Sequence, residues 1–149
     1  MAVSYKVCID CADPHRLAAF WAEALGYVVE DHSAFIQRLL DDGVPVQDAV
    51  TELDGRFAWR HAAAVRDPDH PVHPERGTGL GGRVLFQVVP KPKQGKNRVH
   101  LDLHHGPENV EKEVARLCEL GATRIGEGQE GGSRWVVLAD PEGNEFCVA

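Results

Sequence analysis

The chain has 149 residues, of which 43% are hydrophobic, so it has the size of one ordinary domain that can bury its own core. Its 16 Lys and Arg residues against 23 Asp and Glu residues give a formal net charge of −7, and no basic run stands out. Nucleic acid and acidic membranes are therefore poor partners.

The sequence also bears on where the protein resides. No apolar stretch is long enough to span a bilayer, and residues 1–6 do not resemble a signal peptide. Four scattered cysteines do not form a disulfide framework. We therefore expect a cytoplasmic protein.

The beginning of the chain predicts a strand followed by a helix. Residues 5–9 alternate with period two, which places Tyr5, Val7 and Ile9 on one face of a strand and Lys6 and Cys8 on the other. An amphipathic helix then begins at an N-cap and a first-turn proline and ends at a glycine: Asp13, Pro14 and Gly26.

The second half of the chain repeats this pattern. Residues 98–104 alternate as a strand, a Gly-Pro pair breaks the alternation, and a helical stripe from Val110 to Cys118 ends before Gly121. Short β-like runs follow at 122–125, 133–139 and 144–148, with a turn at 140–143. The repeat of two such units predicts two β-α-β-β-β modules.

The first unit contains an insertion. Residues 33–40 predict a helix capped by Ser33, and residues 46–53 predict a second short helix. Residues 62–65 and 83–89 resemble a hairpin with an enlarged tip at 70–82, which we interpret as a lid over a ligand pocket. We expect one domain over 1–149, with module one at about 1–90, a linker at about 90–97 and module two at about 98–149.

The paired modules, the Leu-Gly helix end in each and the Asp-Pro-x-Gly turn at 140–143 resemble the vicinal oxygen chelate superfamily (glyoxalase, bleomycin resistance protein and dioxygenase) over nearly the whole chain. Five segments, at 9–14, 20–21, 85–90, 96–103 and 135–147, are more narrowly similar to uncharacterised glyoxalase-like domain proteins common in actinobacteria. The resemblance implies an α+β fold in which the modules form a curved, half-open sheet, with helices on the convex face, a ligand on the concave face and a homodimer.

The resemblance also implies where a metal site would lie. Members that use metal draw one ligand from the first and one from the last strand of each module, and the matching positions here are Lys6, Gln87, His100 and Cys147. A lysine ammonium has no lone pair to donate, so this set is not the usual tetrad and no metal is favoured. The alternative is a divalent ion (Fe, Mn, Ni, Co or Zn) bound by His100 with Glu145, Gln87 or a loop histidine.

The strongest polar cluster in the sequence lies on one face of the strand at 98–104, where His100, Asp102 and His104 alternate with apolar residues. His100 and Asp102 are the candidate acid-base pair, and polar residues on the open face of a half-buried strand are the equally weighted alternative. Trp135 either stacks on a planar ligand or fills core, and Cys147 is either a small hydrophobe or a nucleophile. The expected ligand pocket comprises Lys6, Cys8, Gln87, His100, Asp102, His104, Trp135, Glu145 and Cys147.

Three functions follow from these patterns. The first is a small-molecule-binding domain without the usual metal site, which sequesters a ligand or transfers a proton. The second is a divalent-metal lyase, isomerase or dioxygenase that acts on vicinal oxygens. The third is a dimeric protein-interaction module, and fold-level likeness does not choose among the three.

Overall fold

The computed structural model describes residues 1–149 and contains two four-stranded sheets with the same topology. The first sheet has the order β1-β6-β5-β2, with β1 at Val7–Cys11, β6 at Arg83–Val88, β5 at Ala62–Arg66 and β2 at Val28–Val29. The second has the order β7-β10-β9-β8, with β7 at Asp102–Leu103, β10 at Glu145–Val148, β9 at Ser133–Ala139 and β8 at Thr123–Glu130. In each sheet the first and last strands of the module are parallel neighbours. The two β-α-β-β-β modules and the α+β class are confirmed.

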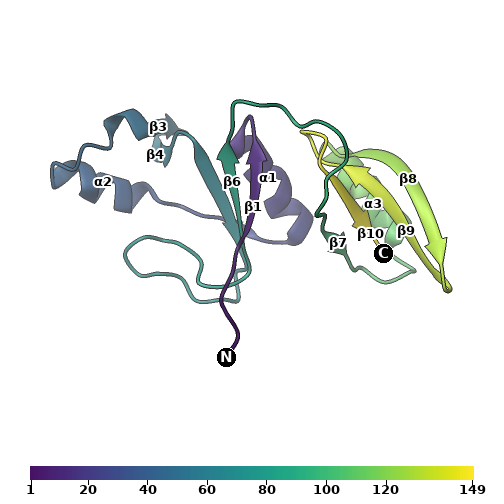
Figure 1. The fold of residues 1–149 in the computed structure, drawn as a ribbon. Helices are drawn as coiled ribbons and strands as arrows, with labels where there is room; N and C mark the ends of the chain where they lie inside the picture. Colours follow the sequence, from purple (N-terminus) through teal and green to yellow (C-terminus); the bar gives the residue numbers. More distant parts are fainter.

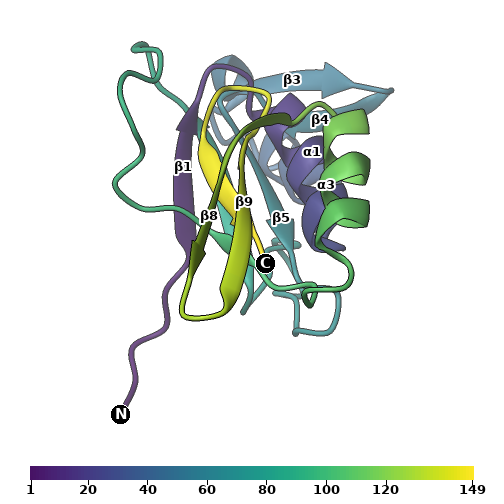
Figure 2. The same cartoon turned by 90° about the vertical axis from the view of Figure 1, so that its right-hand side faces the viewer.

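One helix follows the first strand of each module, namely α1 (Pro14–Leu25) in module one and α3 (Val110–Glu119) in module two. The sheets stand beside each other in Figure 1, and Figure 2 shows the two helices together on one side of them. Leu17 and Trp21 of α1 and Leu117 of α3 belong to one cluster of 20 buried residues to which both sheets contribute. The helices therefore cover one face of each sheet and leave the opposite faces open.

Local sequence signals account for the ends of α1. The Asp13 side chain accepts a hydrogen bond from the Arg16 backbone N–H at 3.1 Å, Pro14 begins the helix, and Gly26 ends it in the left-handed conformation at φ 67°. All three assignments from the sequence are confirmed.

The first strand of each module is shorter than expected. β1 begins at Val7, so Tyr5 and Lys6 precede it, although Cys8 and Asp10 are exposed as the alternation predicts. β7 contains only two residues instead of the predicted run over 98–104. The reason is pairing: its neighbour β10 begins only at Glu145, which the parallel register places beside His100, so residues 98 and 99 have no strand beside them.

The insertion between β2 and β5 is only partly helical. The helix α2 occupies Ser33–Asp41 as expected, but its N-cap residue is His32 without a side-chain cap, and the Ser33 N–H donates to Asp31. The second predicted helix over 46–53 is wrong. A short 3-10 turn, η1 (Gln47–Ala49), leads into β3 (Val50–Leu53), which pairs with β4 (Arg56–Trp59) across an Asp54-Gly55 turn with positive φ at both residues. An Asp-Gly pair that follows a run with the β-branched residues Val50 and Thr51 and precedes one with the aromatic residues Phe57 and Trp59 is a hairpin signal that outweighs the weak helical spacing.

The hairpin with an enlarged tip is confirmed as β5 and β6, which pair from Ala62 with Gln87 to Arg66 with Arg83. The tip at 67–82 contacts the chain after β2, where the Gly79 N–H donates to the Glu30 carboxylate at 2.7 Å. None of the helices is both long and apolar enough to cross a membrane.

Trp135 on β9 lies across Gly128 on β8, and a Cβ added to Gly128 would overlap the indole ring. We expect Gly128→Ala to lower the free energy of unfolding by about 1–3 kcal/mol, because the ring must leave its position. Urea unfolding followed by far-UV circular dichroism measures the change. Gly126→Ala on the same strand is the matched control, since a Cβ there meets no atom within 4 Å. Equal stability of the two variants would contradict the expectation.

Candidate functional site

The open face of module two brings together side chains from neighbouring strands. In β9, Val136 and Leu138 are buried in the core, so Val137 between them faces the open side. In β10, Phe146 and Val148 are buried, and Cys147 faces the open side opposite Val137. The parallel register then places Cys147 beside Asp102 of β7.

His100 completes a cluster with these two residues. The His100 Nε2 atom lies 3.3 Å from Asp102 Oδ1, and the potential ligand atoms of His100, Asp102 and Cys147 all lie within 4.8 Å of one another. The side chains of His100 and Asp102 are 39% and 51% exposed, so a ligand can reach both from solvent. The structure therefore gathers an imidazole, a carboxylate and a thiol at one accessible point.

The thiol of Cys147 is held in its protonated form. Burial, followed by the neighbouring Asp102 carboxylate, raises its pKa from 9.0 to about 11. A nucleophilic cysteine, one of the two roles considered for Cys147, needs a lowered pKa. The shift has the opposite sign, so Cys147 is a thiol at neutral pH.

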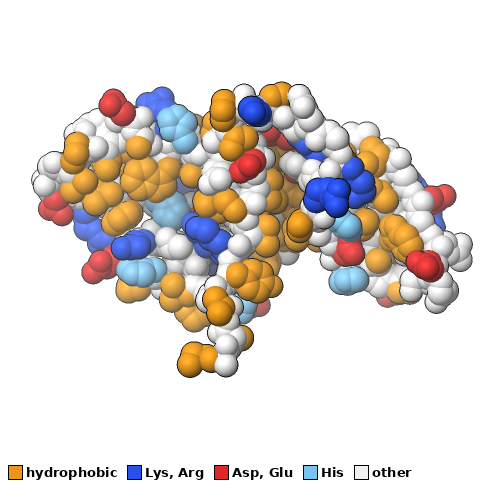
Figure 3. Space-filling view, in the orientation of Figure 1, with side chains coloured by type: hydrophobic (Ala, Val, Ile, Leu, Met, Phe, Trp, Pro, Cys, Tyr) orange, Lys and Arg blue, Asp and Glu red, His pale blue; other side chains and the backbone are white.

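A groove of about 560 Å³ separates β1 from module two, with the chain from Val89 to Leu101 along one side. The hollow between the two halves of the molecule is visible in Figure 3. Its walls include Ile9 and Phe146 among apolar residues, and Cys8, Asp10 and His100 among polar ones. A volume of this size is typical of small-molecule sites.

A second hollow of about 500 Å³ lies between the modules near the N-terminal segment, and Asp102 and Lys6 are on its wall. Val7 and Leu101 line both hollows. Since His100 lines the first hollow and Asp102 the second, the pair stands where the two meet.

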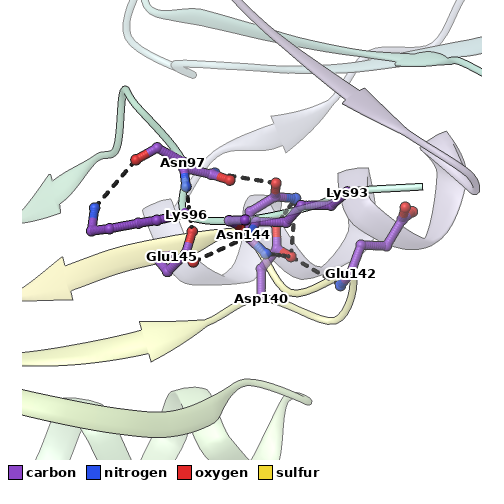
Figure 4. Close-up of polar contacts among 8 residues, drawn as sticks. Lys93, Lys96, Asn97, Asp140, Glu142, Asn144 and Glu145 are labelled. Carbon is purple, nitrogen blue, oxygen red and sulfur yellow. Dashed lines mark hydrogen bonds and ion pairs between the residues drawn. The ribbon is translucent and has the colours of Figure 1, made fainter. Parts of the chain in front are cut away.

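Glu145 is not part of the cluster. Its carboxylate accepts hydrogen bonds from the Asn97 backbone N–H at 3.0 Å and from Lys93 Nζ at 3.1 Å (Figure 4). The hydrogen bond from the Asn97 N–H lowers the pKa of Glu145 by more than burial raises it. Together with the Lys93 contact it brings this pKa to about 2. Through these two hydrogen bonds Glu145 connects the linker to β10. The pattern did not identify Lys93 and Asn97 as its partners, because nothing in the alternation of residues describes the path of a linker.

The matching strands of module one lack such a cluster. Cys8 of β1 pairs with Leu85 of β6, and Asp10 pairs with Gln87. The Gln87 side-chain N–H donates to Asp10 at 3.0 Å. Lys6 precedes β1 on the wall of the second hollow.

The two remaining expected pocket residues lie elsewhere on module two. His104 follows β7 and is exposed, and its side chain makes no hydrogen bond or ion pair. Trp135 is half-buried on the open face and packs across Gly128.

The comparison with protein families agrees with this arrangement. A family model described as a glyoxalase-like domain matches residues 6–149, so the chain belongs to the glyoxalase-like domain family. No curated protein sequence is a significant match.

Solved structures of the glyoxalase, bleomycin resistance and dioxygenase class share the fold. An enzyme of this class from Burkholderia phytofirmans is 17% identical, with a TM-score of 0.59 over 96% of this chain and 94% of that one. The fosfomycin resistance protein FosX from Mesorhizobium loti is 9% identical, with a TM-score of 0.59 over 99% and 90%. A FosX mutant from Listeria monocytogenes, solved with Mn(II) and 1S,2S-dihydroxypropylphosphonic acid, is 11% identical, with a TM-score of 0.56 over 99% and 87%. At these identities the likeness shows the fold alone.

Proposed function

We propose that this protein binds a small molecule in the groove between its modules and that His100 and Asp102 act on it as an acid-base pair. The observation that carries the proposal is the 3.3 Å contact between the two side chains, with His100 on the wall of the 560 Å³ groove and Asp102 on the wall of the second hollow. A carboxylate next to Nε2 favours the tautomer with the proton on Nε2, which leaves the Nδ1 lone pair free to accept a proton from a ligand. The homodimer that the family resemblance implies is part of this proposal.

A second candidate is a divalent metal bound by His100, Asp102 and Cys147, because their donor atoms are close enough to contact one ion. Imidazole, carboxylate and thiolate donors suit zinc and similar ions, although Cys147 must first lose a proton against its raised pKa. Such an ion would polarise oxygen atoms of a ligand. The Mn(II) in the FosX structure motivates including that ion in the test.

The first experiment measures the metal content per protomer after incubation with Fe(II), Mn, Ni, Co or Zn and desalting. Less than about a tenth of an equivalent supports the acid-base proposal, whereas about one equivalent that His100→Ala removes would replace it with the metal site. His61→Ala is the matched control, since His61 is exposed and lies in module one.

Thermal shift with a library of small vicinal diols, 2-hydroxy acids and dihydroxyphosphonates then identifies a ligand. We expect His100→Ala to fold normally and to weaken binding of the identified compound by about tenfold, which is the effect of one lost polar contact. His61→Ala should leave binding unchanged. Unchanged binding in both His100→Ala and Asp102→Asn would overturn the proposed site.

A further inference from the structure

Module one contains a separate pocket of about 230 Å³ on the open face of its sheet. The floor is formed by Ala62 and Ala64 of β5 and Leu85 of β6. The insertion supplies the walls, with Phe35 from α2 and Trp59 from β4. The 67–82 tip adds Arg76 and Thr78. The tip that the sequence suggested as a lid thus lies over this pocket and not over the groove beside His100.

Basic side chains from four separate segments line the pocket: Lys6, His32, Arg76 and Arg83. No carboxylate is on its wall, and the Glu30 side chain, which pairs with His32 and Arg83, is fully buried. The side chains of Lys6 and Arg76 are exposed and form no ion pair within the protein.

Arg83 is positioned to bind an anion. Its Nε and Nη2 atoms donate to the two Glu30 oxygens at 2.8 and 2.9 Å, which fixes the plane of the guanidinium group. The remaining terminal nitrogen, Nη1, has no hydrogen-bond acceptor within the protein. A guanidinium group that is bound to a carboxylate along one edge still has free N–H donors on its other edge, and these can bind a second carboxylate.

His32 adds a further positive charge. Its Nδ1 lies 2.7 Å from the Arg76 carbonyl oxygen and its Nε2 lies 3.0 Å from Glu30 Oε2. Both partners are acceptors without a proton, so both ring nitrogens must donate and the ring is an imidazolium. Burial lowers the pKa of His32, but the contacts with Glu30 and the Arg76 carbonyl outweigh it and the net shift is upward. Two of the four basic residues pair with Glu30 and the other two, Lys6 and Arg76, have no paired carboxylate, which leaves the pocket positively charged.

The apolar half of the pocket favours a flat ligand. The rings of Phe35 and Trp59 pack edge to face with centroids 6.4 Å apart, and the alanine floor between them is smooth. We propose that module one holds a second binding site, for a small aromatic carboxylate whose acid group contacts Arg83 and Arg76 and whose ring lies against Trp59 and Phe35. The volume accommodates a single ring with short substituents.

Isothermal titration with benzoate at low salt tests this site, with benzamide as the neutral analogue of the same shape. We expect benzamide to bind at least tenfold more weakly than benzoate. Arg76→Gln should weaken benzoate about tenfold, which is the effect of one lost charge-assisted contact. Arg98→Gln is the matched control, because Arg98 is exposed and lies outside the pocket. Neither exchange removes an ion pair, and thermal melting confirms that both variants fold.

Three results would overturn the proposal: equal binding of benzamide and benzoate, unchanged benzoate binding in Arg76→Gln, or inorganic phosphate binding as tightly as benzoate. His100→Ala distinguishes this site from the proposed function. It should leave benzoate binding unchanged, since His100 lies on module two and does not line this pocket.

Discussion

Glu30→Ala should lower the free energy of unfolding by about 3–5 kcal/mol, because it leaves Arg83 and His32 without their common carboxylate. The Glu30 side chain is 0% exposed, and those of Arg83 and His32 are each 12% exposed, so water replaces the lost contacts poorly. The Gly79 N–H also loses its acceptor, which releases the 67–82 tip from the sheet. Urea unfolding at pH 7 measures the change.

Glu52→Ala is the control for this exchange, because Glu52 is exposed on β3 and forms no ion pair. It should change stability by no more than about 0.5 kcal/mol. A loss in Glu30→Ala that matches that of the control would show that the buried network does not stabilise the fold.

The same network makes stability depend on pH. Burial raises the pKa of Glu30, but hydrogen bonds from His32, Arg83 and the Gly79 N–H outweigh it and lower the pKa from 4.5 to about 2. The stabilisation is therefore fully present above pH 4.5 and is lost as the pH falls toward 2. Protonation of Glu30 should therefore lower the free energy of unfolding by an amount on the order of 3 kcal/mol over that range.

His32 has the opposite dependence. Because its pKa is raised, its contribution to stability is present below pH 6.5 and is lost as the pH rises through the raised value.

Glu30→Gln separates the acid effect from packing, because glutamine keeps the shape and has no proton to gain. We expect its free energy of unfolding to fall less steeply than that of the wild type between pH 4.5 and 2, as measured by urea titrations at several pH values. Parallel curves would show that other carboxylates cause the acid sensitivity.

Local signals in the sequence predicted the repeated architecture well. Asp13, Pro14 and Gly26 act within a few residues of chain, so the bounds of α1 follow from them directly. The β3–β4 hairpin was missed because residues 46–53 combine weak helical spacing with β-branched residues, and the Asp54-Gly55 turn was given too little weight. Period two also predicted that His100 and Asp102 share a face, and the structure brings them together.

The remaining features of the site depend on contacts distant in the sequence. Alternation identifies a face but not a register, so the match of Gln87 with Cys147 stays a prediction: β6 pairs with β1 through both Cys8–Leu85 and Asp10–Gln87. Glu145 lies on the expected face, yet Lys93 and Asn97 of the linker occupy its carboxylate. The basic pocket of module one combines residues from four segments, so no local pattern in the sequence predicts it.

The turn after β9 joins the two modules, which gives Asp140→Ala the other large expected effect. Asp140 is 3% exposed, and its Oδ2 atom accepts a hydrogen bond from the Trp21 indole N–H of α1 at 3.0 Å. Its Oδ1 atom accepts from the backbone N–H groups of Glu142 and Asn144 at 2.9 and 3.0 Å (the turn is drawn in Figure 4). Glu142 in turn accepts from the backbone N–H groups of Ala12 and Asp13 at the start of α1.

Asp140→Ala should lower the free energy of unfolding by about 3–4 kcal/mol, since four N–H donors, including the Asn144 side-chain amide, lose their common acceptor at once. A double-mutant cycle with Trp21→Phe isolates the contact between modules, because phenylalanine keeps the aromatic packing on Phe146 and removes the indole donor. We expect a coupling energy of about 2 kcal/mol between the two sites, measured by urea unfolding with far-UV circular dichroism. Additive effects would mean that packing alone joins α1 to module two. A clear coupling would mean that the Asp-Pro-x-Gly turn sets how the two modules dock, and with it the width of the groove beside His100.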